Sequence, residues 1–515
     1  MIVVTINKEK YRYDIHAIFK SFFPEEEINV YIKGTRDDKS DEGKISADIF
    51  VGDDEGYMEM TLVSADGSIK HEKKECLTRA EVEKRLNPDV ALSTSGENDS
   101  AIVPRNVLKK LIYVLLSEET GKQLPWGNLT GIRPTGIPMN MMNEGKSDEE
   151  IAAFMKSVYY VSDEKIDLGI EIARRELDIL KDIDYKDGYS MYIGIPFCPT
   201  TCLYCSFTSY PIFSFRDKVD RYLDCIEKEL DYVAEAFKDK KLNTIYVGGG
   251  TPTTLEPEQM DRLLTMVEDK LDLSNLKELT VESGRPDSIT VNKLRAMKKH
   301  NVTRISVNPQ TMRDKTLKFI GRQHTVAQLI DAYNMARAEG FDNINMDIIL
   351  GLPGETEDDV RYTMEEIMKL DPDDLTVHSL AIKRASRLRE WIEQNGLSTI
   401  NNTESMMEIA REYADKMNLK PYYLYRQKNM AGNYENTGYA REGAAGIYNI
   451  LIMEEVQSIV ALGAGTVTKR VYVDETTGER TGRIERCDNV KDIDLYMDKI
   501  DEMIDRKRKL FGDEK

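Results

Sequence analysis

The chain has 515 residues, of which 41% are hydrophobic and 31% are charged, and its formal net charge is −20. This composition predicts a folded protein with room for two or three domains, and the acidic excess argues against nucleic-acid or anionic-membrane binding by bulk electrostatics. No apolar run reaches the ~20 residues that a membrane span requires. Six cysteines without a recognisable signal peptide lead us to expect a cytoplasmic protein with reduced thiols.

Residues 1–185 are expected to form a separate N-terminal α/β domain. Short β-branched runs, separated by turn signals at 53–56 and at Asp66-Gly67, predict strands over 2–7, 29–32, 45–52 and 57–63.

Two helices are predicted to follow these strands. Apolar residues at helical spacing indicate a helix over 103–119, and Ser147 with Glu150 forms a capping box for the second. The polar, turn-rich segment between them, residues 125–135, contains Trp126. It is either a loop that reaches toward an active site or an ordinary packed loop.

Strands alternate with helices from residue 186 to 385, which predicts a parallel sheet. A helix is predicted over 216–237, and Thr356 is predicted to cap another. Six β/α units fit a partial (β/α)6 version of the TIM barrel, which places its chemistry at the carboxyl ends of the strands. The candidate strands are 190–195, 243–247, 278–282, 304–307, 343–349 and 375–378.

Three cysteines, Cys198, Cys202 and Cys205, follow the first of these strands at C-x3-C-x2-C spacing. Thiolates are soft ligands that suit iron–sulfur clusters or zinc. Three thiolates can hold three corners of a 4Fe–4S cube and leave the fourth iron open for a small molecule. Structural zinc normally takes four Cys or His ligands, and no fourth lies close in sequence. The spacing therefore favours the cluster, with zinc as the alternative.

Other unusual residues also fall at predicted strand ends. The second strand runs into Gly248-Gly-Gly-Thr-Pro252, where glycines let backbone groups approach a ligand closely. Glu282 ends the third strand, Gln310 follows the fourth, and Asp347 lies in the fifth. Because motif position and fold rule agree, we expect one functional site at this end of the sheet.

The cysteine loop, with Tyr204 before its last cysteine, resembles the radical S-adenosylmethionine (SAM) signature. From about 190 to 470 the chain resembles the oxygen-independent coproporphyrinogen III oxidase family, most closely its HemZ type. The matching segments are Tyr192-x-x-Ile-Pro-Phe-Cys198, Gly248-Gly-Gly-Thr-Pro252, Glu282-Ser-Gly-Arg-Pro286, Ser306-Val-Asn-Pro-Gln310, Gly321-Arg-Gln-His-Thr325, Asn345-Met-Asp347-Ile-Ile-Leu-Gly-Leu-Pro353 and Ala461-Leu-Gly-Ala-Gly-Thr466.

This resemblance implies that Cys198, Cys202 and Cys205 bind a 4Fe–4S cluster and that two SAM molecules bind at each site. The implied contacts of the first SAM are Tyr192, Tyr204, Gly249, Gly250, Thr251, Glu282 and Arg322. Those of the second are Gln310, Asp347, Ala381 and Val467.

The implied reaction converts coproporphyrinogen III to protoporphyrinogen IX in haem biosynthesis. A reductase, flavodoxin or ferredoxin supplies an electron, SAM yields a 5′-deoxyadenosyl radical, and the radical takes a hydrogen from the β-carbon of a propionate. Loss of CO2 and one electron then leaves a vinyl group. The tetracarboxylate substrate requires cations, and Arg285, Lys383, Arg384 and Arg387 are candidates, with solvated surface charge as the alternative.

Two positions depart from the oxidase pattern. Phe207 stands where the oxidases carry a fourth cysteine, and Gly194 stands where they carry His. The related haem chaperones also lack that cysteine. Three functions therefore compete: the oxidative decarboxylase, a haem-binding chaperone without oxidase activity, and another radical SAM reaction on a tetrapyrrole.

Residues 386–515 are expected to form a C-terminal α+β extension that covers the substrate. A helix is predicted over 404–417, and the Tyr-, Gly- and Asn-rich stretch 421–434 is either a cover for a flat tetrapyrrole or a packed loop. A charged, solvent-exposed helix is predicted near the end of the chain, from about residue 490. The remaining cysteines, Cys76, Cys225 and Cys487, are predicted to be packing residues.

Overall fold

The structure is a computed structural model that describes residues 1–24, 26–33, 45–51, 57–64, 70–76, 105–131, 133–184, 187–383, 386–395, 400, 402–427, 434–474, 476–477 and 480–512. The chain divides into two compact units: Met1–Arg174 with Arg426–Glu435 form unit 1, and Arg175–Tyr425 with Asn436–Lys515 form unit 2. The expected three domains, divided at residues 185 and 385, stay a prediction. Among the helices of the described stretches, none combines the length and apolarity needed to cross a bilayer.

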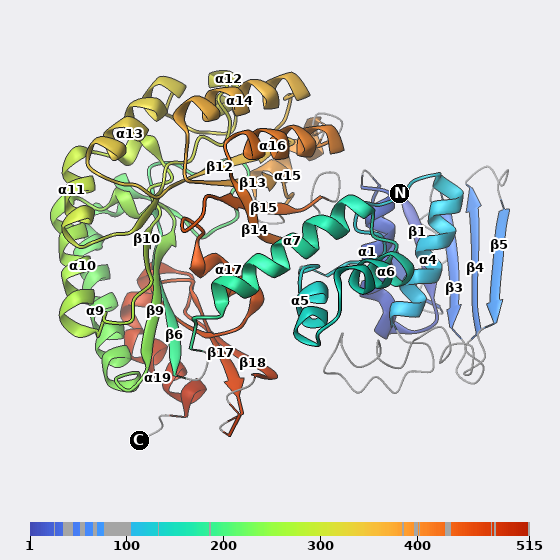
Figure 1. Ribbon diagram of the computed structural model, residues 1–515, viewed down its shortest axis with the longest axis horizontal. Coiled ribbons are helices and arrows are strands. Elements are labelled where there is room, and N and C mark those ends of the chain that lie inside the picture. The colour runs from blue at the N-terminus through green and yellow to red at the C-terminus, as the bar shows by residue number, and fades with distance from the viewer. Residues whose placement is uncertain are drawn as a thin grey trace. The chain divides into compact units, whose positions relative to one another are not determined.

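Unit 1 contains a five-stranded sheet in the order β2-β1-β3-β4-β5. Strand β1 is parallel to β2 and β3, whereas β3, β4 and β5 pair antiparallel. Its elements are β1 (Ile2–Ile6), α1 (Arg12–Phe22), β2 (Ile28–Ile32), β3 (Ile45–Val51), β4 (Tyr57–Ser64), β5 (Lys70–Cys76), α4 (Arg105–Thr120), α5 (Gly136–Asn143), α6 (Asp148–Tyr159) and most of α7 (Asp163–Leu180) (Figure 1).

The four predicted strands and both predicted helices of this unit are confirmed, and the capping box of Ser147 and Glu150 is present at α6. Helix α1, helix α7 and strand β5 were not predicted. The predicted turns at 53–56 and at Asp66-Gly67, and the predicted start of the helix at 103–104, lie outside the described residues.

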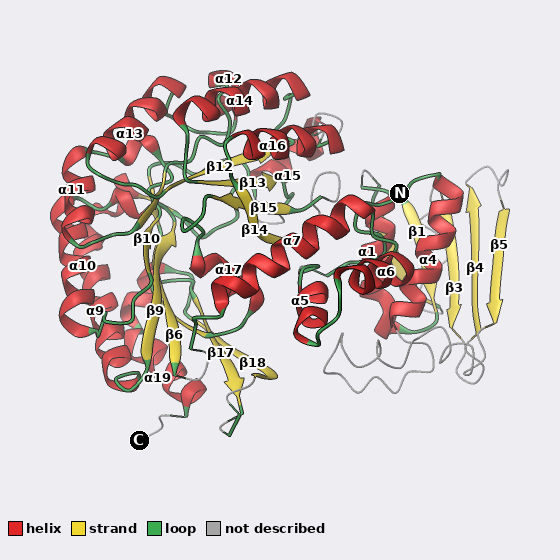
Figure 2. Ribbon diagram, in the orientation of Figure 1, coloured by secondary structure: helices red, strands yellow, loops and turns green. Residues whose placement is uncertain are grey.

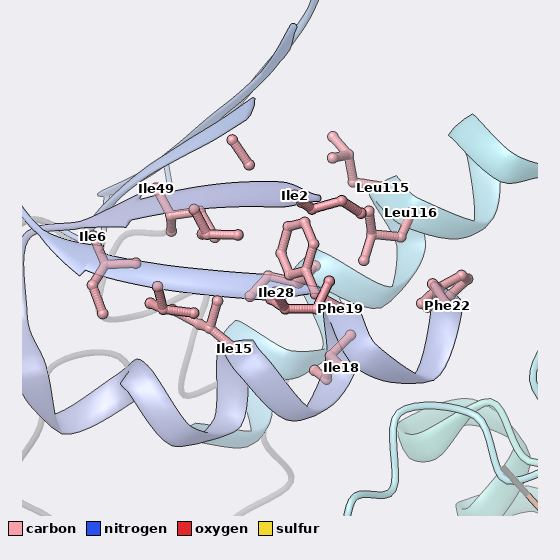
Figure 3. Close-up of a cluster of buried hydrophobic side chains, with 14 of the residues drawn as sticks. Ile2, Ile6, Ile15, Ile18, Phe19, Phe22, Ile28, Ile49, Leu115 and Leu116 are labelled. Atoms are coloured by element: carbon pink, nitrogen blue, oxygen red, sulfur yellow. The ribbon is translucent and has the colours of Figure 1, made fainter. Parts of the chain in front are cut away.

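A hydrophobic cluster packs one face of this sheet against α1 and α4 (Figure 3). Alternate residues of β1 belong to it, as the two-residue period of a strand requires, and α1 contributes a stripe at helical spacing. The labelled members are Ile2, Ile6, Ile15, Ile18, Phe19, Phe22, Ile28, Ile49, Leu115 and Leu116.

The segment Arg426–Glu435 belongs to unit 1 although it connects two strands of unit 2. The buried carboxylate of Glu435 accepts hydrogen bonds from Trp126 Nε1 at 2.7 Å and Lys165 Nζ at 2.8 Å, and Arg426 donates to the carbonyl of Leu129 at 2.6 Å. Trp126 is fully buried. Of the two interpretations of its loop, the packed loop is therefore correct.

Unit 2 contains an eleven-stranded sheet and the following elements: β6 (Gly188–Ile195), β7 (Phe197–Cys198), β8 (Tyr210–Pro211), α8 (Ile212–Phe215), α9 (Val219–Ala236), β9 (Lys241–Gly249), α10 (Pro257–Lys270), β10 (Glu278–Val281), α11 (Val291–Lys299), β11 (Arg304–Ser306), α12 (Asp314–Phe319), α13 (Val326–Ala338), β12 (Ile344–Leu350), α14 (Glu357–Leu370), β13 (Asp374–Ser379), α15 (Arg387–Asn395), α16 (Glu404–Lys416), β14 (Lys420–Tyr425), β15 (Asn436–Ala440), α17 (Ile447–Glu454), β16 (Ser458–Leu462), β17 (Val467–Val473), β18 (Arg480–Asp488), α18 (Ile493–Asp498) and α19 (Ile500–Phe511).

The six predicted strands are β6, β9, β10, β11, β12 and β13, and they pair in parallel in that order. In Figure 2 the strands form the inner layer of this unit and the helices that connect them form the outer layer. The predicted β/α architecture is confirmed. Thr356 caps α14 through a capping box with Asp359, as expected for the helix that it begins.

A seventh parallel strand was not predicted. Strand β16, from the C-terminal region, pairs in parallel with β6, so that Ala461 lies beside Tyr192. Strands β17 and β18 continue the sheet on this side, and β15 and β14 continue it antiparallel beyond β13. The region after residue 386 thus supplies five strands to the same sheet as the β/α units.

A buried ion pair joins the amino ends of two parallel strands. Arg304 begins β11 and donates to Asp374, the first residue of β13, at 2.7 Å, and Tyr422 donates to the same carboxylate oxygen at 2.9 Å. Both charged side chains are almost completely buried. Such a network at the amino ends stabilises the sheet, while the carboxyl ends remain for chemistry.

Two expectations for the C-terminal region are wrong. Residues 421–425 form strand β14 and not a loop, with Tyr422 and Tyr423 buried, whereas 428–433 lie outside the described residues. The final helix α19 is not merely a solvated face. It buries Lys507, whose Nζ donates to Glu229 of α9 at 2.6 Å.

Candidate functional site

The cysteine loop, defined as residues 198–205, begins in β7 just after β6 and is held by backbone hydrogen bonds from two other segments. Leu203 donates to the carbonyl of Ile320 at 2.9 Å, and Leu388 donates to the carbonyl of Leu203 at 2.9 Å. Thr200 Oγ1 also donates to the carbonyl of Gly321 at 3.1 Å. The loop conformation is therefore fixed by the protein chain itself.

The three thiols lie in a sheltered environment. Cys202 is buried and the other two are half-buried, and Thr251 Oγ1 donates to Cys198 Sγ at 3.5 Å. Burial first, and then the negative charge of Cys205 and Cys202, raises the pKa of Cys198 to about 11. The three thiols belong to one short loop, residues 198–205. Ligation requires thiolates, so a metal that binds here would release protons.

The donor set of the cysteine loop is compatible with a 4Fe–4S cluster. No three Cys, His, Asp or Glu side chains in the described part of the chain gather closely enough to hold a single metal ion. A cube, by contrast, is held through three separate irons, each with its own thiolate. Three half-buried or buried thiols on one fixed loop are the donor set that a cube requires.

The glycine turn at the end of β9 packs directly against the cysteine loop. Gly250 donates to the carbonyl of Ile195 at 2.8 Å, and Thr251 donates to the carbonyl of Phe197 at 2.7 Å. Gly249 has a φ of +105°, which side-chain-bearing residues rarely adopt. A Cβ at Gly250 would lie only 2.6 Å from the carbonyl oxygen of Phe197.

Replacing Gly250 with alanine is expected to displace the cysteine loop, because the new methyl group meets backbone that no rotamer change can move. We expect a destabilisation of about 1–3 kcal/mol and a lower iron content after anaerobic reconstitution. Gly136→Ala is the control, since open space surrounds that position. Equal iron content in Gly250→Ala and Gly136→Ala would contradict the prediction.

Glu282 lies immediately after β10 and faces the same region. Tyr246 of β9 donates to Glu282 Oε1 at 2.6 Å. Burial raises the pKa of Glu282 to about 7, with a smaller contribution from the charge of Asp347. The rings of Tyr192, Tyr246 and Tyr448 stack, with centroids 4.7 Å apart for Tyr246 and Tyr448. These rings form an apolar wall beside a carboxyl group that titrates near neutral pH.

Arg322 is buried and connects the strand ends to the cysteine loop. Its Nη1 donates to the carbonyls of Gly284 at 2.8 Å and Asn308 at 3.1 Å, and its Nη2 donates to Tyr204 Oη at 3.2 Å. Its Nε is buried and has no hydrogen-bond acceptor among the described residues. The guanidinium is thus oriented by the protein, and its Nε–H stays available to a ligand.

Gln310 and Asp347 are joined through their backbones and through Asn308. Gln310 N–H donates to the carbonyl of Asp347 at 2.9 Å, and Asn308 Nδ2 donates to Asp347 Oδ2 at 2.6 Å. Gln310 has a φ of +64°, a strained conformation for a residue with a side chain, and its Oε1 is a buried acceptor with no donor among the described residues. Such an acceptor indicates a binding position.

Burial alone would raise the pKa of Asp347, but the neighbouring His378 and Asn345 hold it below its ordinary value. His378 Nε2 lies 3.8 Å from Asp347 Oδ2, and Asn345 Nδ2 donates to Oδ1 at 2.7 Å. Asp347 is therefore ionised and can accept hydrogen bonds from hydroxyl groups.

The predicted site residues thus fall into one contact network, with two exceptions. Ala381 lies two residues beyond β13, and Val467 begins β17 with 42% of its surface exposed. Their side chains are hydrocarbon and form no hydrogen bonds, so hydrogen bonding does not place them in the network. Their role stays a prediction.

Two of the four cationic residues predicted to bind the substrate donate hydrogen bonds to the cysteine loop instead. Arg285 is buried and donates to Thr200 and Asp287, and Arg387 donates to the carbonyl of Thr201. We therefore withdraw both as partners of a substrate carboxylate. Lys383 is half-buried, and burial lowers its pKa. Arg384 lies outside the described residues.

Three residues of the site were missed in the sequence. Tyr246 could have been found, because it precedes Gly248 by two residues and so shares one face of β9 with it. Asn308 lies inside the Ser306–Gln310 motif and was not singled out. Tyr448 belongs to α17, and no local pattern connects that helix with β6 or β9.

Comparison with known proteins agrees with this geometry. Residues 192–367, which include the cysteine loop, the glycine turn and Asp347, match the model of the Radical SAM superfamily. The oxygen-independent coproporphyrinogen-III oxidase-like protein HemZ of Bacillus subtilis is 41% identical over 430 residues, which cover 83% of this chain and 84% of that protein. The haem chaperone HemW of the same organism is 34% identical over 243 residues, or 47% of this chain and 63% of that protein.

Coproporphyrinogen III oxidase (HemN) from Escherichia coli, described as a radical SAM enzyme, is a solved structure with 19% identity and a TM-score of 0.49. The match covers 64% of this chain and 72% of that chain.

The fold is that of the Radical SAM superfamily, which implies a 4Fe–4S cluster and SAM. Because the identity to HemZ extends over most of both chains, this chain belongs to the HemZ family of oxygen-independent coproporphyrinogen-III oxidase-like proteins.

Proposed function

We propose that this protein catalyses the oxygen-independent oxidative decarboxylation of two propionates of coproporphyrinogen III, which gives protoporphyrinogen IX. The observation that carries the proposal is the cysteine loop with the glycine turn hydrogen-bonded against it at the carboxyl ends of β6 and β9. Cys198, Cys202 and Cys205 would hold the cluster. When bound, the cluster and SAM supply an organic radical that removes a hydrogen atom from the substrate.

The chain contributes binding, orientation and exclusion of water. In this proposal Gly249, Gly250 and Thr251 offer backbone groups to the first SAM, and Arg322 pairs with its carboxylate. The first site is completed by Tyr192, Tyr204 and Glu282. A second SAM would contact Gln310, whose buried Oε1 needs a donor, together with Asp347, Ala381 and Val467. Lys383 is the described cation that we propose for a substrate carboxylate.

In the same proposal a reductase, flavodoxin or ferredoxin supplies the electron, and the protein is located in the cytoplasm. The cysteines whose side chains the structure describes, Cys198, Cys202, Cys205, Cys225 and Cys487, are all free, which suits a reducing compartment.

Binding of SAM is expected to depend on pH through Glu282. Its carboxyl group carries a negative charge and accepts the stronger, charge-assisted hydrogen bonds only when it is ionised, and its pKa is about 7. Affinity should therefore rise by about tenfold between pH 6 and pH 8, with proton release on binding. Isothermal titration calorimetry in buffers of different ionisation enthalpy measures both the affinity for SAM and the number of protons released. Glu282→Gln should flatten this dependence, and an equally steep pH profile in that variant would count against the assignment.

A haem chaperone is the second candidate. Two observations favour it: the 34% identity to HemW, and Phe207, which stands in place of the fourth oxidase cysteine and is 73% exposed. An exposed aromatic ring two residues after Cys205 could stack on a flat macrocycle.

An anaerobic assay separates these functions. The reconstituted full chain is incubated with a reductant, SAM and coproporphyrinogen III, and the products are read by mass spectrometry. Vinyl products and CO2 support the decarboxylase. Tight haem uptake without porphyrinogen turnover supports the chaperone. Abundant 5′-deoxyadenosine with a different tetrapyrrole product indicates another radical SAM reaction.

A further inference from the structure

Arg285 makes contacts that the proposed reaction does not require of it. It lies in the segment that follows β10, and only 4% of its surface is exposed. Its Nε donates to Asp287 Oδ1 at 2.9 Å and its Nη2 donates to Asp287 Oδ2 at 2.8 Å. This bidentate pair locks the plane of the guanidinium and neutralises its charge, so that burial is tolerated.

The remaining donors of Arg285 all point to the cysteine loop. Nη1 donates to the carbonyl of Thr200 at 3.3 Å, and Nη2 donates to Thr200 Oγ1 at 3.1 Å. Nη1 also lies 3.7 Å from Cys202 Sγ, within hydrogen-bond distance of a sulfur. Cys202 is the most buried of the three cysteines, so its sulfur depends on the protein for hydrogen bonds.

We propose that Arg285 is a positioning residue of the cluster site that holds Cys202 and stabilises the reduced cluster through a charge-assisted hydrogen bond to the ligand sulfur. Reduction adds one electron, taken from an external one-electron donor, and neither makes nor breaks a bond in the protein. The added negative charge resides partly on the sulfurs. A donor fixed against one of them therefore favours the reduced state and raises the reduction potential.

This geometry requires arginine. One planar group reaches a carboxylate, a carbonyl, a hydroxyl and a thiol at once, whereas a lysine ammonium is a compact point charge without the fork. Arg387 is a natural control, because it also holds the cysteine loop but donates to the backbone carbonyl of Thr201 and not to a sulfur.

The inference rests on the cluster of the proposed function and is independent of the substrate. Arg285→Met, Arg285→Lys and Arg387→Met are made in the full chain and reconstituted anaerobically, and bound iron and sulfide are measured. The midpoint potential of each cluster is determined by redox titration monitored by electron paramagnetic resonance.

For Arg285→Met, we expect the ratio of reduced to oxidised cluster at the wild-type midpoint to fall by about tenfold, a shift of about 59 mV for one electron. Arg285→Lys should shift in the same direction by less, and Arg387→Met should keep the wild-type midpoint.

Each other outcome decides the question. Unchanged midpoints in both Arg285 variants overturn the inference, as does an equal shift in Arg387→Met, which would trace the effect to loop packing. If neither Arg285 variant binds a cluster while Arg387→Met does, Arg285 is required to assemble the cluster, which overturns the inference that it tunes the potential of an assembled one. If the wild-type chain itself binds no cluster, the proposed function fails, and that failure is distinct from the others.

Discussion

Cys198→Ala is expected to abolish the bound cluster and, with it, every SAM-dependent reaction of this protein. The cube depends on three thiolates, and the described chain offers no spare thiol beside the loop. Cys225 lies in α9 and donates to a backbone carbonyl of α18, and Cys487 lies in β18. With two thiolates, one iron loses its protein ligand, and the cluster becomes labile.

The measurement is iron and sulfide content after anaerobic reconstitution, together with 5′-deoxyadenosine formation from SAM and a strong chemical reductant. Cys225→Ala is the matched control, since it removes a buried thiol of the same size outside the loop. It should keep the wild-type iron content. A Cys198→Ala protein that still carries a full cluster and cleaves SAM would refute the assignment of the cysteine loop.

Lys507→Met is expected to be the most destabilising substitution outside the site. Glu229 is completely buried and accepts hydrogen bonds from Lys507, Asn489, Tyr496 and the backbone N–H of Gly463. Removing the cation leaves a buried carboxylate without its counter-charge, which costs about 3–5 kcal/mol. Because Glu229 holds Gly463, the loss also reaches the turn that follows β16 beside the site.

Hydrogen exchange of peptides from β16 and α19 measures this effect locally, which matters in a chain of two units. We expect exchange to accelerate by roughly two to four powers of ten. Lys416→Met is the control, because its pair with Glu412 lies on the surface and contributes little. The double variant Glu229→Gln, Lys507→Met should recover part of the stability. If Lys507→Met behaves like Lys416→Met, the buried pair is not what anchors α19.

Local sequence patterns predicted the motifs of the site better than the residues that hold these motifs in place. The spacing of the three cysteines and the glycines after β9 was sufficient to predict the chemistry, because both are short motifs whose function depends on near neighbours. The capping box at Ser147 and the cap at Thr356 were likewise correct, since a cap satisfies donors within three residues.

The misplaced cations show where this reasoning stops. Arg285 and Arg387 were candidates for a substrate carboxylate because they lie near strand ends, with solvated surface charge as the alternative, yet both donate to the cysteine loop. A charged side chain has no local pattern that tells whether it faces a ligand or another loop. Lys507 was expected in water for the same reason, because its helix is highly charged in sequence.

The sequence alone determined the class of protein and the alternation of its β/α units, since each of these depends on period, spacing or short motifs, and it predicts the residues that would hold the cluster. Only the tertiary structure decided that β16 adds to the sheet beside β6, that Tyr448 stacks on Tyr192 and Tyr246, and that Arg285 contacts the sulfur of Cys202. These contacts join residues far apart in the chain, and what selects them is the burial of apolar rings and the pairing of buried charges, which no local pattern encodes.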